Sequence, residues 1–282
     1  MTLNETYKKG GNLLKENGID NCEFEARIII EHVCSYNYSD FLLNRNSTLS
    51  NDLEEAILKK IDERCSGCPL QYVICGWEFI GLTFKVGEGV LIPRPETEEL
   101  CKFVIDQIKD KPKPVVFDLC SGSGCIGLSI KHFNPNADVY LIEYSDDALM
   151  FLNQNRESLG FARSVPVIKG DVLGGFERFA FLPKPDVIVS NPPYIKTDEI
   201  PTLQKEVLFE PKMALDGGCD GYEFYDCFAQ KWIDCVNEGG LFAVECGEQQ
   251  AEYISNIFAS HCKTVKIKRD FNDIERFVVA FK

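Results

Sequence analysis

An apolar strand gives way to a helix at Asp118-Leu119-Cys120-Ser121-Gly122-Ser123-Gly124. The strand is predicted over 115–119 and the helix over 126–133, from the change in hydrophobic pattern. Glycines between them let the backbone turn tightly and approach a ligand closely. Because folds of several chemistries use such loops, the motif predicts a ligand at the strand end but leaves its identity open.

Strands and helices alternate on both sides of this loop. Further strands are predicted over 139–142, 165–169, 187–190, 241–245, 264–268 and 276–280, with helices over 146–159, 222–236 and 249–259. Alternation of this kind is typical of an α/β, Rossmann-like domain, whose mostly parallel sheet carries helices on both faces. Ligands of such sheets bind beyond the carboxyl ends of the strands.

The residues before the sheet follow a different hydrophobic pattern. Over the first 65 residues apolar side chains recur at helical spacing, and a capped helix start is predicted at Asn51. From Gln71 to Ile92, strand formers such as Tyr72 and Val73 surround Gly81, which predicts a β-hairpin. A helix follows, to about residue 108. We therefore expect a helical domain over 1–68, a hairpin linker over 69–92 and the α/β domain over 93–282.

Composition and charge exclude several classes of protein. No apolar run approaches the roughly 18 residues of a membrane span, and no signal peptide is apparent, so we expect a cytoplasmic protein. The 13 cysteines are expected to be reduced, and the pair Cys65 and Cys68 lacks the second pair that a zinc site needs. The net charge of −14 disfavours nucleic acid, and the basic cluster over 263–269 is interpreted as a solvated face.

Acidic residues end the next two strands. Glu143 is placed to accept hydrogen bonds from the two hydroxyls of a ribose, and Asp171 from an adenine amine, with Val172 packing on the ring. Each residue taken alone also fits a solvated strand end, but their joint occurrence favours a cofactor site. Since Gly127 formally completes the pattern G-x-G-x-x-G, a nicotinamide dinucleotide remains open here.

Asn191-Pro192-Pro193-Tyr194 follows the fourth apolar strand. The two prolines fix φ and remove two backbone donors, which leaves carbonyl acceptors in a rigid turn. The Asn191 side-chain oxygen and the Pro192 carbonyl are placed to accept both hydrogens of a planar NH2 group, with Tyr194 as a wall beside it. A proline-rich turn also occurs as an ordinary structural feature. After a strand end of this fold, it predicts a site that aligns an amide or amino nitrogen with a sulfonium methyl group.

These motifs resemble the class I methyltransferases that act on planar nitrogen. Four further segments resemble the PrmC/HemK family of peptide chain release factor N5-glutamine methyltransferases: Pro69-Leu70-Gln71-Tyr72, Trp77-Glu78-Phe79, Ile92-Pro93-Arg94-Pro95-Glu96-Thr97-Glu98 and Phe209-Glu210-Pro211. The similarity covers the catalytic domain and the hairpin, whereas the N-terminal region matches in length and helical character. One departure is Cys120, where many relatives carry glycine.

The resemblance implies an S-adenosyl-L-methionine-dependent methyltransferase that acts on the glutamine of the Gly-Gly-Gln loop in class 1 release factors. The helical domain and hairpin would help to bind the release factor, and a monomer without metal is expected. The implied cofactor-binding residues are Asp118, Cys120, Ser121, Gly122, Ser123, Gly124, Glu143, Asp171, Val172 and Asn191. The implied substrate-binding residues are Asn191, Pro192, Pro193 and Tyr194, of which Asn191, Pro192 and Tyr194 are catalytic, while Arg94 and Glu96 support the site.

Two alternatives use the same residues differently. One is a methyltransferase of another planar nitrogen, either adenine N6 in nucleic acid or a glutamine in a ribosomal protein. The other is a binding module that keeps the fold without the activity. The intact glycine loop and the Asn191 turn count against this second alternative, and the net charge counts against nucleic acid.

Overall fold

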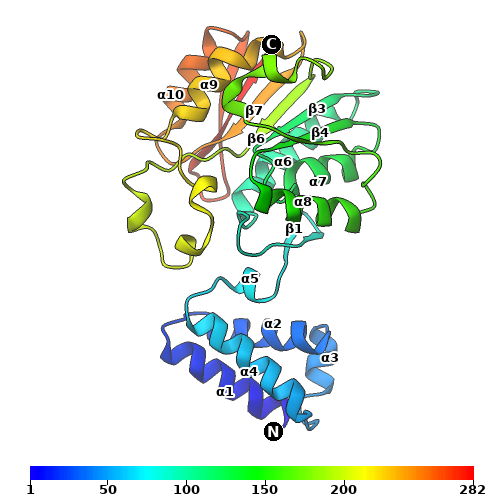
Figure 1. Cartoon of the computed structure of the whole chain (residues 1–282), viewed down its shortest axis with the longest axis vertical. Helices are drawn as coiled ribbons and strands as arrows, with labels where there is room; N and C mark the ends of the chain where they lie inside the picture. Colours follow the sequence, from blue (N-terminus) through cyan, green and yellow to red (C-terminus); the bar gives the residue numbers. More distant parts are fainter. The chain divides into compact units, whose positions relative to one another are not determined.

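The computed structural model describes all residues, from Met1 to Lys282 (Figure 1). By its internal contacts the chain divides into two compact units. Unit 1 consists of Met1–Gly76 together with Gln204–Phe209, and unit 2 of Trp77–Leu203 together with Glu210–Lys282. None of the helices combines the length and the apolar character that a membrane span requires.

Unit 1 is helical, as the sequence predicts. Its helices are α1 (Leu3–Glu16), α2 (Cys22–Cys34), α3 (Tyr38–Leu43), α4 (Asn51–Cys65) and the short α5 (Leu70–Val73). Reciprocal hydrogen bonds between Thr2 and Glu5 cap the start of α1, and Ser50 caps α4. The helices bury a core of their own, formed by Leu3, Leu14, Ala26, Ile29, Ile30, Ile57 and Ile61.

The hairpin is shorter than predicted. It consists of β1 (Trp77–Phe79) and β2 (Leu82–Phe84), joined at Ile80 and Gly81, which both have positive φ. Tyr72 and Val73 lie in α5, so the prediction of strand there was wrong. Their backbone N–H groups donate to the carbonyl of Pro69, and burial of both side chains in a helical turn overrides their β propensity.

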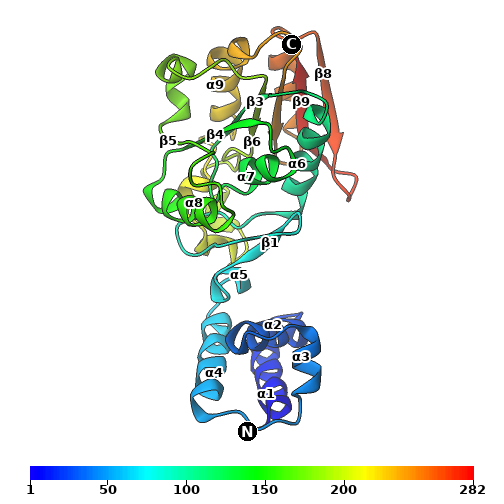
Figure 2. The same cartoon turned by 90° about the vertical axis from the view of Figure 1, so that its right-hand side faces the viewer.

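Unit 2 contains a seven-stranded sheet in the order β5-β4-β3-β6-β7-β9-β8 (Figure 2). The strands are β3 (Val115–Leu119), β4 (Asp138–Glu143), β5 (Val167–Lys169), β6 (Val187–Ser190), β7 (Leu241–Glu245), β8 (Thr264–Arg269) and β9 (Glu275–Phe281). The strands from β5 to β7 run parallel, whereas β9 is antiparallel to both of its neighbours. The mostly parallel sheet predicted from the sequence is thus confirmed.

Helices cover both faces of the sheet (Figure 1). One apolar core packs α6 (Pro95–Ile108), α7 (Cys125–Phe133) and α8 (Asp146–Ser158) on one face, and a second packs α9 (Glu223–Lys231) and α10 (Ala251–Ala259) on the other. The side chains of β6 alternate between them, with Val187 and Val189 in the first core and Ile188 in the second. Helix α9 ends earlier than predicted, and Ile233–Cys235 continues as a 3-10 turn.

Candidate active site

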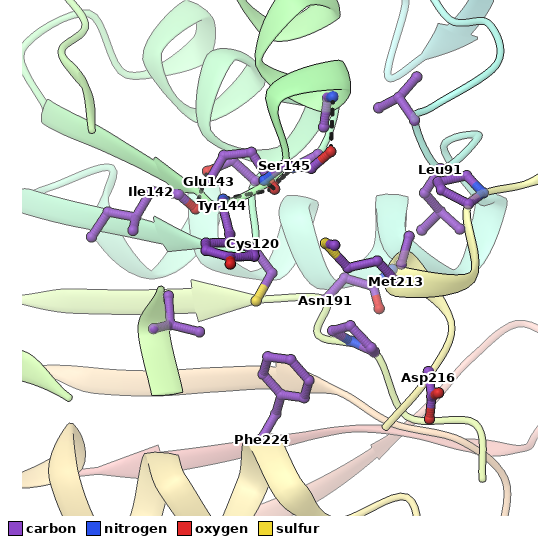
Figure 3. A pocket seen from close by; sticks show the side chains of 18 of the residues that line it. Leu91, Cys120, Ile142, Glu143, Tyr144, Ser145, Asn191, Met213, Asp216 and Phe224 are labelled. Atoms are coloured by element: carbon purple, nitrogen blue, oxygen red, sulfur yellow. Dashed lines mark hydrogen bonds between the residues drawn. The ribbon is translucent and has the colours of Figure 1, made fainter. Parts of the chain in front are cut away.

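The register of the sheet brings the predicted site residues together. Leu119 in β3 lies opposite Ile142 in β4 and Ser190 in β6. Because these strands are parallel, the residues next to the paired positions lie at one edge of the sheet. They are Cys120 and Asn191, which follow β3 and β6, and Glu143, which ends β4 and pairs with Lys169 of β5. A cavity of about 720 Å³ lies at this edge, and the three side chains face it in Figure 3.

Nine of the predicted site residues line this cavity and four do not. The lining residues are Cys120, Ser121, Gly122, Ser123, Glu143, Asp171, Val172, Asn191 and Pro193. The predicted residues outside the lining are Asp118, Gly124, Pro192 and Tyr194.

The loop after β3 winds through alternating positive φ angles. Cys120, Gly122 and Gly124 have φ of 57°, 55° and 81°. A Cβ atom on Gly122 would meet nothing within 4 Å, so the positive φ angle and not a lack of space favours glycine there. Gly127 serves packing instead, because a Cβ atom on it would lie 2.2 Å from the Leu141 side chain. The third glycine of G-x-G-x-x-G is thus explained by the contact between α7 and the sheet.

Asp118 holds α7 against the sheet and does not face the cavity. Its Oδ2 accepts a hydrogen bond of 2.9 Å from the Gly127 backbone N–H, while Oδ1 is buried without a partner. Burial raises the pKa of this carboxyl group to about 8, although the Gly127 bond opposes the shift. Asp118, predicted as a cofactor-binding residue, is therefore not among the residues that line the cavity. The Asp118 side chain lies on the same face of the sheet as that of Val116, which belongs to the core that packs against α7.

Glu143 is nearly buried and already holds the glycine loop. Its carboxylate accepts three hydrogen bonds of 2.8 Å each, from the backbone N–H groups of Gly122, Tyr144 and Ser145 (Figure 3). Burial raises the pKa of Glu143, and these bonds oppose that shift. A carboxylate has about four lone-pair positions, so one is left for a ligand. Two ribose hydroxyls would therefore have to displace one backbone donor.

Asp171 and Val172 form the next part of the wall. Asp171 Oδ1 accepts from the Leu173 backbone N–H at 2.9 Å and thereby caps the 3-10 turn Val172–Gly174. Val172 is buried, and its carbonyl accepts a 2.8 Å hydrogen bond from the Trp232 indole. The apolar wall and the neighbouring carboxylate are therefore both held in place by local structure.

The charge of the lining discriminates between ligands. Four carboxylates and one guanidinium line the cavity: Glu143, Asp171, Asp216 and Glu223, with Arg94. Such a surface favours a cationic ligand and repels the two phosphates of a nicotinamide dinucleotide. The charge argues against the dinucleotide that the glycine pattern left open.

Asn191 is held at the cavity wall by a chain of hydrogen bonds. Its Nδ2 donates to Thr97 Oγ1 at 3.1 Å, and that hydroxyl donates to Glu245 Oε2 at 2.6 Å. Thr97 and Glu245 are 2% and 1% exposed, and burial raises the pKa of Glu245 to about 7. Because Nδ2 is engaged, Oδ1 is the atom of Asn191 left for a ligand.

Tyr194, predicted as a wall of the substrate site, is not among the residues that line the cavity. Backbone hydrogen bonds join Ile195 to Leu215 and to Gly217, so the chain after Pro193 runs along this neighbouring loop. The Tyr194 ring packs against the core under α9 and α10, where burial raises its pKa. Pro193 lines the cavity but Pro192 does not.

Comparison with known proteins assigns the chain to a family. Residues 5–74 match the model of the PrmC N-terminal domain, and 94–219 match the methyltransferase small domain. The release factor glutamine methyltransferase of Clostridium acetobutylicum is 33% identical over 100% of this chain and 99% of its own. The chain belongs to the release factor glutamine methyltransferase family. The Moorella thermoacetica member is 33% identical, over 91% of this chain and 89% of its own.

The fold of this family member also agrees with solved structures. A methyltransferase from Pyrococcus furiosus covers 72% of this chain and 90% of its own with a TM-score of 0.51, at 18% identity. At that identity the likeness concerns the fold alone. It confirms the class I methyltransferase architecture predicted from the alternation of strands and helices.

Several residues of the site in this family member were not predicted from the sequence. The most consequential are Thr97, which lines the cavity, and Glu245, which is hydrogen-bonded to Thr97. Glu245 ends an apolar strand, which is the same signal that identified Glu143, so the sequence contained the information. Met213 and Phe224 also line the cavity. Met213 lies in an irregular segment without periodicity, whereas Phe224 lies in α9, a helix that was predicted without its position beside the cavity.

The segment before α6 is anchored by a buried carboxylate. Glu210 is 5% exposed and accepts hydrogen bonds from the Ile92 backbone N–H at 2.9 Å and from the Arg94 guanidinium. Burial raises the pKa of Glu210, and Arg94 opposes the shift. Since Arg94 lines the cavity, this pair fixes one side of its wall and supports the role predicted for Arg94.

Proposed function

We propose that this protein transfers a methyl group from S-adenosyl-L-methionine to the side-chain amide nitrogen, N5, of a glutamine in a protein. The substrate is the glutamine of the Gly-Gly-Gln loop in a class 1 peptide chain release factor. The observation that carries the proposal is Asn191, whose Nδ2 is engaged by Thr97 while its side chain lines an acidic cavity. Membership of a family named for this reaction supports the same substrate.

The cavity fits the proposed cofactor in size and charge. A volume of about 720 Å³ suits a ligand of that size, and S-adenosyl-L-methionine carries a net positive charge that the four lining carboxylates favour. Glu143 and Asp171 would accept hydrogen bonds from its ribose and adenine, and Val172 would pack on the base. Cys120 to Ser123 would border it through their backbone. When bound, the cofactor supplies an electrophilic methyl group.

Asn191 would compensate for the weak nucleophilicity of an amide. The nitrogen lone pair of an amide is delocalised into its carbonyl, so orientation is the main contribution that the protein can make. Asn191 Oδ1 would accept one N–H of the glutamine amide and hold its nitrogen toward the methyl group. The amide nitrogen would form a bond to the methyl carbon as the sulfur–carbon bond breaks, and it would then lose a proton to water. A second acceptor, the Pro192 carbonyl, does not line the described cavity, so the proposal depends on Asn191.

The remaining parts of the chain have a proposed role in substrate binding. We assign residues 1–68 to a domain that binds the release factor, with residues 69–92 as a linker and 93–282 as the catalytic domain. The match of residues 5–74 to a domain model of this family supports a separate N-terminal domain, whose match extends past residue 68. The enzyme would act as a monomer in the cytoplasm, where release factors work.

Transfer of labelled methyl groups tests the proposed function. Purified protein and labelled cofactor should label a release factor but not its loop Gln→Ala variant. Asn191→Ala should lower the rate by about 10²-fold because an oriented acceptor is lost. Asn153→Ala removes an amide of α8 that bonds to the Leu149 carbonyl outside the cavity, and it should leave the rate unchanged. Equal labelling of both release factors, or labelling of RNA in their place, would overturn the proposal.

A further inference from the structure

Three elements of unit 2 meet at the Asn191 side chain. Thr97 lies in the first turn of α6, Glu245 at the carboxyl end of β7, and Asn191 directly after β6. Because Ser190 in β6 pairs with Val244 in β7, the residues that follow are neighbours at the strand edge. The hydrogen bonds Asn191 Nδ2 to Thr97 and Thr97 to Glu245 join all three.

The number of hydrogen atoms on these groups decides which of them donates in each hydrogen bond. An ionised carboxylate only accepts hydrogen bonds, so Thr97 must donate its single hydroxyl hydrogen to Glu245. The Thr97 oxygen can then only accept, and the group of Asn191 that faces it must be the NH2. A separation of 2.6 Å between Thr97 Oγ1 and Glu245 Oε2 is typical of a hydroxyl bonded to a charged carboxylate.

We propose that Thr97 and Glu245 are positioning residues that fix the orientation of the Asn191 amide, so that its Oδ1 and not its Nδ2 faces the substrate. The inference rests on the proposed function, in which Asn191 accepts a hydrogen bond from the glutamine NH2. If the Asn191 amide were turned by 180°, its own NH2 group would face the NH2 group of the substrate glutamine. Both groups are donors, so no hydrogen bond could form between them. We call the hydrogen-bonded series Glu245, Thr97 and Asn191 the relay. The planar amide of Asn191 can adopt two orientations, and the relay selects the productive one.

Protonation of Glu245 would remove this selection. A protonated Glu245 can donate to Thr97, whose hydroxyl hydrogen is then free to bond Asn191 Oδ1 in the turned orientation. Burial raises the pKa of Glu245 to about 7, while the Thr97 hydrogen bond and then Arg276 lower it. Other titratable or charged groups near it are Arg94, Glu96, Tyr194, Tyr225, Cys125 and Cys246. Turnover should therefore fall as the pH decreases through about 7.

A matched pair of variants separates positioning from packing. Thr97→Ser keeps the hydroxyl and should retain wild-type kcat, whereas Thr97→Val keeps the shape and should lower kcat by about 10²-fold through misorientation. Cofactor affinity, measured by calorimetry, should be unchanged in both. Circular dichroism establishes that both variants are folded. Wild-type kcat in folded Thr97→Val would overturn the proposal.

The pH profile gives a readout that a merely structural residue would not change. Wild-type enzyme and Thr97→Ser should lose about tenfold in kcat per pH unit below the pKa of Glu245, as one required ionisation predicts. Thr97→Val should be slow at every pH and lack this acid limb. No histidine lines the cavity, so the loss of kcat at low pH cannot come from the titration of a histidine there. An unchanged limb in Thr97→Val would contradict the relay.

Nuclear magnetic resonance tests the relay independently of the substrate. The side-chain NH2 signals of Asn191 should shift with pH around 7 in the wild type and in Thr97→Ser, but not in Thr97→Val. If these signals titrate while no release factor is methylated, the relay stands and the proposed substrate falls. If methylation occurs but the signals do not respond, the relay falls and the proposed function stands.

Discussion

At the scale of single residues, Cys120 carries a backbone conformation that suits glycine. Its φ of 57° lies in the left-handed region, where a Cβ atom costs roughly 1–2 kcal/mol. Glycine avoids this cost but loses about 0.5–1 kcal/mol through its greater freedom in the unfolded chain. We therefore expect Cys120→Gly to be more stable than Cys120→Ala by about 0.5–1 kcal/mol.

Urea denaturation followed by tryptophan fluorescence measures this difference. Both tryptophans, Trp77 and Trp232, belong to unit 2, so the signal reports the unit that contains the loop. The alanine variant is the matched control, because it loses the thiol and keeps the strained backbone. Equal stability of the two variants would show that the loop relaxes and that position 120 is not strained.

The residue scale also shows how far sequence reasoning reached. Glu143 ends one apolar strand and Asn191 directly follows another, and the parallel register brings them to one edge as predicted. Asp118 lies within its strand, and strict alternation directs it to the face that packs against α7. That direction was available from the sequence. The direction of Tyr194 was not, because it depends on hydrogen bonds to a loop some 20 residues later in the chain.

At the scale of elements, one arginine joins α4 to two other segments of unit 1. The Arg64 side chain is 4% exposed and donates to Glu25 of α2 at 2.5 Å and to Glu206 of the segment Gln204–Phe209 at 2.5 Å. Removing the cation leaves the 12% exposed Glu25 without its partner. Arg64→Met should therefore destabilise unit 1 by about 3 kcal/mol.

Hydrogen exchange checks this prediction segment by segment. In Arg64→Met the amides of Gln204–Phe209 should exchange faster than in the wild type, while tryptophan fluorescence of unit 2 stays unchanged. Lys60→Met is the control on the same helix, since the half-buried pair of Lys60 with Glu63, three residues further along α4, contributes no more than about 0.5 kcal/mol. Similar losses in both variants would mean that the Arg64 pairs contribute no more than a surface pair does.

Element types were predicted best where the hydrophobic period is long. The strand β3 has the predicted bounds, and the helix α4 begins at the predicted residue, Asn51. Tyr72 and Val73 of α5 were misassigned because short apolar runs fit strand and helix equally, and the hydrogen bonds to the carbonyl of Pro69 decided between them. No pattern indicated that Gln204–Phe209 packs with unit 1, since this depends on the ion pair of Glu206 with Arg64 across 142 residues.

At the scale of the whole molecule, unit 2 buries carboxyl groups whose pKa values lie above those of the unfolded chain. Burial raises the pKa of Asp118 to about 8 and of Glu245 to about 7, from 3.8 and 4.5. The folded state therefore holds protons that the unfolded chain releases between these values. Stability from such groups is complete below the unfolded pKa and is lost as the pH rises through the folded pKa. Carboxyl groups whose pKa is lowered on folding, such as those of Asp216 and Asp234, change the free energy of unfolding with pH only below about pH 4.

The free energy of unfolding of unit 2 should consequently fall between pH 5 and pH 8. Each such carboxyl contributes a slope of about 1.4 kcal/mol per pH unit between its two pKa values. Asp118→Asn stays neutral and still accepts from the Gly127 N–H, so it should remove one of these slopes. Urea denaturation at several pH values, followed by tryptophan fluorescence, measures the difference. Asp106→Asn, at a 71% exposed side chain, should keep the wild-type slope, and parallel curves for Asp118→Asn and wild type would show that Asp118 is ionised in the folded protein.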